Sequence, residues 1–219
     1  MAARQFQKKA RYSAQFDQRP HILIAAEGKN VTEKNYLTSL WRDHHPETVI
    51  DFVDKKGATD PETMLNNVEN AWKDKPMNSD RGDKAYVVLD LDCDEKKARL
   101  INQLNSIREH AVFIVSNPCF EVWFLMHFRY STRQFASSSE VIKELKGKGC
   151  IPNYQKNVDV YSLIKDKLKT ARDNAKRLES SYLNDGVHWP SSHYNPRTDV
   201  LTVVNKILGE EDDQESVKP

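Results

Sequence analysis

The chain has 219 residues, of which 30% are charged and 38% are hydrophobic, and its formal net charge is +1. This length supports one sizeable hydrophobic core, or one core with a small annex. The near-zero net charge does not indicate a nucleic-acid partner, so only local basic patches can argue for one. We expect a charged globular protein.

The cysteines and the N-terminus predict the compartment. Cys93, Cys119 and Cys150 are odd in number and widely spaced, and they form no CxxC or Cys/His zinc pattern. Reduced thiols in the cytoplasm are therefore expected. Residues 1–20 are basic and polar without a hydrophobic signal core, and no segment approaches the roughly 20 apolar residues of a membrane span. This tail is either solvated or an arm that touches nucleic acid.

Strand and helix patterns alternate from residue 21. Short apolar runs predict strands, and apolar residues three or four apart predict helices. Asp60 before Pro61 is typical of a helix N-cap and first helical position. Repeated strand–helix units predict a doubly wound, mainly parallel sheet covered on both faces. The expected strands are 21–27, 49–53, 85–90 and 111–116, and the expected helices begin at Thr32 and Pro61 and span 95–108 and 119–128.

The second part of the chain predicts a helical C-terminal subdomain over 131–208. One long helix is expected over 158–180 and a final amphipathic helix over 195–208. Residues 209–219 are acidic and are expected to be disordered. The predicted organisation is thus a basic tail (1–20), an α/β core (21–130), a helical annex (131–208) and an acidic tail.

A basic stripe runs along the long predicted helix. Its members are spaced as one helical face, which is either simply solvated or in contact with nucleic-acid phosphates. Lys156, just before the helix, is a further candidate phosphate contact. The stripe consists of Lys165, Lys169, Arg172 and Lys176.

Carboxylates follow the predicted strands at the edge where ligands bind in doubly wound sheets. Glu27 ends the first strand, and Asp90 and Asp92 end the third at alternating positions that should point the same way. Two carboxylates about 4 Å apart repel by roughly 4 kcal/mol at an effective dielectric of about 20, so water, a basic side chain or a divalent cation must offset the repulsion. Hard oxygen ligands suit Mg²⁺ or Mn²⁺. We expect these three residues to bind the metal, with Glu27 also acting as general acid or base.

Other residues near these strand ends have alternative roles. Asp94 is expected to cap the helix that follows it, and it is also a candidate supporting residue of the site, as are Asn117 and Glu121 after the fourth strand. His127 on an apolar helix is either a core histidine or a catalytic one. An EF-hand loop starting at Asp90 fails because Glu95 and Ile101 stand where Gly and Glu are needed. No P-loop, HExxH or GxSxG motif is present.

Six segments together resemble a known family. The end of the first strand with Glu27-Gly28, followed by the Asp90-Leu91-Asp92 strand, resembles a Toprim domain. The complete set resembles the RloB/AbiLii family of bacterial phage-defence proteins over residues 20–208, with SNPCFEVWFLMHF as its most distinctive element. The segments are ILIAAEGKNVTEKNY (22–36), VVLDLDCDE (87–95), SNPCFEVWFLMHF (116–128), YQK (154–156), ARDNAK (171–176) and NPRT (195–198).

The resemblance implies a Toprim-like core with a helical annex, working as a Mg²⁺-dependent nuclease toxin. By carry-over, Glu27 is the acid/base residue, Asp90 and Asp92 bind the metal, and Asn117 and Glu121 belong to the NPxFE element. Family members are typically encoded beside an ABC/AAA15-type ATPase. Related Toprim effectors act on RNA, including tRNA, so RNA is the expected substrate. Two alternatives to an RNA nuclease remain open: a DNA nuclease, and a non-catalytic module of the ATPase complex. A homo-oligomer is a further candidate assembly.

Overall fold

A computed structural model describes residues 19–27, 32–44, 46–53, 59–182 and 186–210. Its centre is a five-stranded sheet of order β2-β1-β3-β4-β5, in which β1 to β4 are parallel and β5 is antiparallel to β4. The strands are β1 (His21–Ala26), β2 (Val49–Phe52), β3 (Lys84–Asp90), β4 (Ala111–Asn117) and β5 (Arg197–Thr198).

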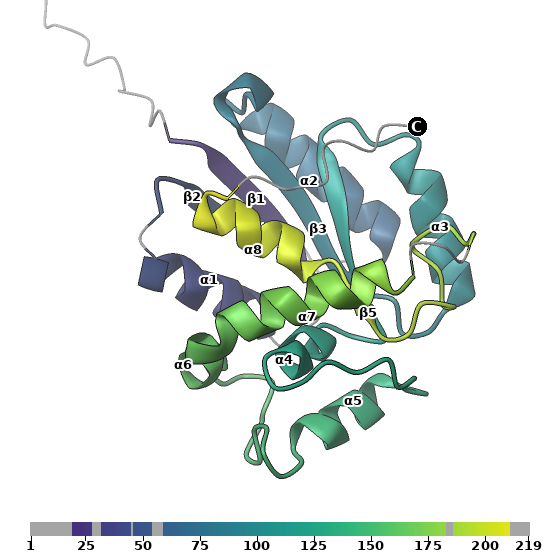
Figure 1. Cartoon of the computed structure of the whole chain (residues 1–219). Helices are drawn as coiled ribbons and strands as arrows, with labels where there is room; N and C mark the ends of the chain where they lie inside the picture. The colour runs from purple at the N-terminus through teal and green to yellow at the C-terminus, as the bar shows by residue number, and fades with distance from the viewer. Residues whose placement is uncertain (1–18, 28–31, 45, 54–58, 183–185, 211–219) are drawn as a thin grey trace, which may run out of the picture.

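The helices cover both faces of this sheet, which confirms the predicted Toprim-like α/β architecture (Figure 1). Asp60 caps α2 by accepting the Thr63 N–H, and Pro61 takes the first helical position, as expected. The α-helices are α1 (Thr32–His44), α2 (Pro61–Asp74), α3 (Glu95–Asn105), α4 (Glu121–Met126), α5 (Ser138–Leu145), α6 (Tyr161–Ile164), α7 (Leu168–Ser180) and α8 (Val200–Leu208).

Alternation along the strands divides the core into two layers. In β3, Tyr86 and Val88 pack with α1, α4, α7 and α8, whereas Val87 and Leu89 pack with α2 and α3 on the opposite face. In Figure 1, α8 crosses the near face of the sheet while α2 lies behind it. Successive residues at a strand end are therefore directed toward different helices.

The strand order places a topological switch point between β1 and β3. The connection through α1 leaves β1 on one side to reach β2, and the connection through α2 returns past β1 to β3. A crevice at the carboxyl ends of β1 and β3 is the usual ligand position in such sheets. Glu27 directly follows β1, and Asp90 is the last residue of β3, so the sheet brings these predicted site residues to this edge.

The prediction of one continuous helix over 158–180 is wrong. The structure has α6, a 3₁₀ turn at Lys165–Lys167, and then α7. The buried positions keep a helical spacing straight through the turn, so the hydrophobic pattern does not reveal the break. These buried residues are Tyr161, Ile164, Leu168, Ala171, Ala175 and Leu178.

Three further element boundaries differ from expectation. The helix predicted over 119–128 is regular only in α4, and the helix predicted over 95–108 ends with α3 at Asn105. The helix predicted over 195–208 begins at Val200, because Arg197 and Thr198 pair with β4 as strand β5. A two-residue strand is too short to show alternation in sequence.

The division of the chain at residue 130 stays a prediction. Beyond it, β5 extends the sheet, and α7 and α8 share a core cluster with β1 and α1. The predicted tails, residues 1–20 and 209–219, lie outside the described part of the chain except for residues 19–20 and 209–210. No helix among the described residues is long and apolar enough to cross a membrane.

Candidate functional site

A tight turn follows β3 at the switch point. Leu91 is fully buried, and Asp92 and Cys93 have φ values of +56° and +59°. The Asp94 N–H donates to the Leu91 carbonyl across this turn at 2.9 Å. The strand alternation expected from Asp90 to Asp92 therefore stops at Asp90, and the backbone redirects Asp92 to the surface.

The end of β4 holds this turn in its left-handed conformation. The N–H of Asp92 donates to the Pro118 carbonyl at 2.9 Å, and that of Cys93 donates to Asn117 Oδ1 at 3.0 Å. A left-handed conformation costs roughly 1–2 kcal/mol for each residue other than glycine. Such strain is concentrated at functional sites in proteins.

Asp90 lies among carboxylates. Its Oδ1 accepts the Phe120 N–H at 2.7 Å, on the side of the sheet occupied by α1 and α4. Burial, followed by the negative charges of Glu33 and Glu121 and then of Asp92 and Glu27, raises the pKa of Asp90 well above its usual range. The surroundings of Asp90 therefore disfavour its ionised form, and a bound cation would stabilise that form.

Glu121 and Lys156 form the inner side of this cluster. Glu121 is 1% exposed and accepts a hydrogen bond from the Tyr154 hydroxyl at 2.6 Å, while Lys156 Nζ lies 3.5 Å from Glu121 Oε1. Burial lowers the pKa of Lys156, but Glu121 and Asp90 more than offset this and raise it overall. Lys156 therefore stays charged at the acidic edge.

Glu27 occupies the other side of the same edge. Its Oε2 accepts the Asp90 N–H at 3.1 Å and lies 3.0 Å from Lys97 Nζ in α3. Lys97 Nζ also lies 3.6 Å from Asp92 Oδ2. A lysine ammonium thus takes a position between the two carboxylates that were expected to share a metal ion.

The structure gathers Glu27, Asp90 and Asp92 at one edge but does not bring their oxygen atoms all within 4.8 Å of one another. Alternation explains this separation, because Asp90 faces α1 and α4 whereas Glu27 meets Lys97 of α3. Sequence reasoning missed Glu33 and Lys97. Glu33 resembled an ordinary first-turn acid of a helix, and Lys97 one member of a charged stretch after the Asp94 cap.

We expect Lys97→Gln to destabilise the metal-free protein by about 1 kcal/mol, because Glu27 and Asp92 lose a half-buried counter-charge. Mg²⁺ should then raise the melting temperature more in this variant than in wild type. Thermal unfolding with and without Mg²⁺ measures both effects. Lys169→Gln, which removes the exposed pair with Asp173, is the matched control and should change little. An unaltered melting temperature and Mg²⁺ response in Lys97→Gln would contradict the assignment.

The remaining residues predicted near the site have defined contacts. Asp94 caps α3, as expected, by accepting the Lys96 and Lys97 N–H groups. Asn117 is fully buried and joins the turn to the C-terminal segment, donating to the Tyr194 carbonyl at 2.9 Å. His127 is a core residue between Tyr36 and the Trp123 carbonyl, and burial lowers its pKa to about 4. It is therefore neutral at physiological pH.

The predicted basic stripe is divided by the 3₁₀ turn, and three of its members contact acids. Lys165 lies 3.1 Å from Asp43, Lys169 lies 2.8 Å from Asp173, and Arg172 pairs with Glu210. Lys176 lies in a separate hollow described below. Phosphate contact by the stripe stays a prediction, and Lys156 is the member of the proposed set that lies beside the acids.

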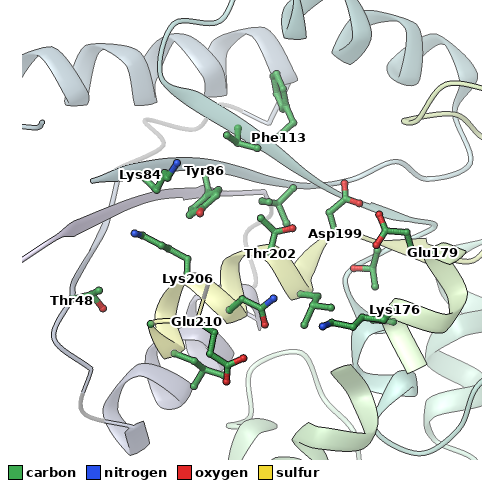
Figure 2. A pocket seen from close by; sticks show the side chains of 18 of the residues that line it. Thr48, Lys84, Tyr86, Phe113, Lys176, Glu179, Asp199, Thr202, Lys206 and Glu210 are labelled. Atoms are coloured by element: carbon green, nitrogen blue, oxygen red, sulfur yellow. The ribbon is translucent and has the colours of Figure 1, made fainter. Parts of the chain in front are cut away.

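Two hollows accompany these elements. The larger, of about 1530 Å³, lies between the sheet and α8, where Lys84, Tyr86, Thr202 and Lys206 line it (Figure 2). None of the acids at the switch point lines it, so it is separate from the candidate site. The smaller, of about 480 Å³, lies beside the turn after β3 and is lined by residues that include Cys93, Arg133 and Asn195.

One group of three potential ligands in the described part of the chain is close enough to hold a metal ion. Its members are Glu69 of α2 with Glu109 and His110, and their ligand atoms all lie within 4.8 Å of one another. Glu109 and His110 directly precede β4, so this cluster is at the sheet edge opposite the switch point. It was not predicted from sequence.

The parallel sheet, its switch point and the acids there define a Toprim-like α/β protein. A comparison with protein-family models matches the RloB-like protein family over residues 22–207, so the chain belongs to this family. Searches of the curated proteins and of the solved structures find no match.

Proposed function

We propose that this protein is a metal-dependent nuclease that acts as a toxic effector in phage defence. The observation that carries the proposal is Asp90, a half-buried carboxyl group among four other acids at the switch point of the sheet. Such an arrangement favours binding of a divalent cation, and perturbed acids in this position are typical of catalytic sites. The role in phage defence is what membership of the family implies.

Asp90 and Asp92, with Glu27, would hold Mg²⁺ or Mn²⁺, and binding would have to draw together carboxylates that are not all within 4.8 Å of one another in this structure. When bound, such an ion polarises a phosphodiester and stabilises its leaving oxygen. Glu27 would hold or release a proton at its carboxylate, and Lys97 would orient that carboxylate through its contacts at 3.0 and 3.2 Å. Lys156, which is 40% exposed, would bind a substrate phosphate.

The proposed substrate is RNA, with tRNA preferred, because related Toprim effectors act on RNA. The hollow beside the turn is lined by Cys93, which follows Asp92, and by Arg133, whose exposed guanidinium is suited to a substrate phosphate. An ABC/AAA15-type ATPase is the proposed partner and regulator. DNA cleavage and a purely regulatory role within the ATPase complex are the competing outcomes of the test.

The test incubates the purified protein, alone and with the proposed ATPase partner, with tRNA, single-stranded DNA or duplex DNA in Mg²⁺ or Mn²⁺. We expect tRNA cleavage that a chelator abolishes. Glu27→Gln should lower the rate by about 100-fold or more, because general acid–base groups contribute about 10²–10⁴.

Asp94→Asn is the matched control, since asparagine caps helices as well as aspartate. It should retain wild-type cleavage and wild-type toxicity in cells, whereas Glu27→Gln should lose both. Equal cleavage by Glu27→Gln and wild type would refute the catalytic assignment. Cleavage confined to DNA would refute the RNA assignment alone.

A further inference from the structure

The carboxylate of Glu69 has one saturated and one unpartnered oxygen. Its Oε1 accepts the backbone N–H groups of Glu109, His110 and Ala111 at 3.2, 2.9 and 3.0 Å. Its Oε2 is buried and has no hydrogen-bond partner, and the residue as a whole is 9% exposed. A buried anionic oxygen without a partner is costly, and a bound cation would compensate it.

Two other ligand groups lie beside the Glu69 carboxylate. Glu109 and His110 each place a ligand atom so that the three groups lie within 4.8 Å of one another. The His110 ring is stacked on Trp72, with centroids 4.6 Å apart and an interplanar angle of 14°. This stacking fixes the imidazole plane next to the Glu69 carboxylate, and the exposed Glu109 and partly exposed His110 leave an entry path for an ion.

We propose that Glu69, Glu109 and His110 form a binding site for a divalent transition-metal ion such as Zn²⁺. One imidazole with two carboxylates is a ligand set that Zn²⁺ accepts, with water in the remaining position, and imidazole disfavours Mg²⁺. This site is at the opposite sheet edge from the proposed nuclease site and does not depend on it. Binding would tie α2 to the start of β4.

Lys73 provides an internal control of this assignment. It lies one helical turn after Glu69, and its Nζ is 3.2 Å from Glu109 Oε2. An ammonium group at this distance competes with a metal ion for the same carboxylate. Removing its charge should therefore strengthen metal binding rather than weaken it, by up to about tenfold at low ionic strength.

The experiment titrates Co²⁺, and Zn²⁺ in competition, into tag-free full-length protein carrying Asp90→Asn, so that the proposed nuclease site does not contribute. Bound Co²⁺ should quench the fluorescence of Trp72, against which His110 is stacked. Glu69→Gln retains Oε1 as the acceptor of three N–H groups and replaces only the free oxygen. His110→Gln removes the imidazole, and His188→Gln, an exposed histidine elsewhere, is the control.

We expect saturable quenching with one Co²⁺ per chain, displaced by Zn²⁺, and a rise in melting temperature with Zn²⁺. Glu69→Gln and His110→Gln should weaken binding by at least about tenfold, His188→Gln should leave it unchanged, and Lys73→Gln should tighten it. Absence of saturable binding up to millimolar metal would overturn the proposal. Equal affinity in Glu69→Gln and the parent protein would do the same.

Discussion

We expect the Asp90→Asn variant to be more stable than wild type in metal-free buffer at pH 7, while losing all cleavage activity. Asparagine keeps an oxygen to accept the Phe120 N–H that now donates to Asp90 at 2.7 Å. The substitution removes a half-buried carboxyl group whose ionised form is disfavoured by burial and by four neighbouring acids. Because the folded protein raises the pKa of Asp90, keeping its carboxyl group costs free energy of folding at pH 7, and asparagine avoids this cost.

The pH dependence of this difference has a definite sign. Because the folded protein raises the pKa of Asp90, the stability linked to its protonation is fully present below the unfolded pKa of about 3.9 and is lost as the pH rises through the folded value. The advantage of Asp90→Asn should therefore grow from acidic to neutral pH. Chemical denaturation between pH 4 and pH 8 measures it.

Bound metal should reverse the order of stability of wild type and Asp90→Asn. Mg²⁺ or Mn²⁺ should stabilise wild type by mass action and leave Asp90→Asn unchanged. Asp94→Asn, the same chemical change four residues further along the chain, should behave like wild type throughout. If Asp90→Asn were less stable than wild type at pH 7 without metal, Asp90 would be a structural acceptor rather than a poised ligand.

Asn117→Ala should destabilise the protein by about 2–4 kcal/mol, which is a loss of roughly 5–15 °C in melting temperature for a chain of this size. Asn117 is fully buried and joins the Cys93 N–H to the Tyr194 and Ser192 carbonyls. Alanine leaves these buried groups without partners. The left-handed turn that carries Asp92 also loses its anchor, so Mg²⁺ binding should weaken.

Asn102→Ala is the matched control for this prediction. Asn102 also donates to the backbone of the C-terminal segment, at the Pro190 carbonyl, but it lies in α3 away from the turn. We expect this control to lose at most about 1 kcal/mol and to bind Mg²⁺ normally. Equal melting temperatures for Asn117→Ala and wild type would show that the turn does not depend on Asn117.

The sequence allowed the sheet and the acidic edge to be predicted, because apolar strand runs and a helix cap such as Asp60 are local signals. It also placed Glu27 and Asp90 correctly at neighbouring strand ends. It did not reveal that they face different layers, because that depends on where each strand ends and on the left-handed turn at Asp92 and Cys93.

Contacts between distant segments were the least predictable part of the site. Glu33 and Lys97 join it through the packing of α1 and α3 beside the strand ends, and nothing in their local sequence distinguishes them from surface charges. The Glu69 cluster is similar, since its ligands are some 40 positions apart and meet only because α2 packs beside the start of β4.

The central claim is that the carboxylates at the switch point bind a divalent cation through Asp90. The most direct test titrates Mn²⁺ into the full-length protein and counts free Mn²⁺ by electron paramagnetic resonance. Using His110→Gln as the background excludes the Glu69 cluster. We predict saturable Mn²⁺ binding that is retained with Asp94→Asn and abolished with Asp90→Asn; binding that is absent, or equal with and without Asp90→Asn, would contradict the account.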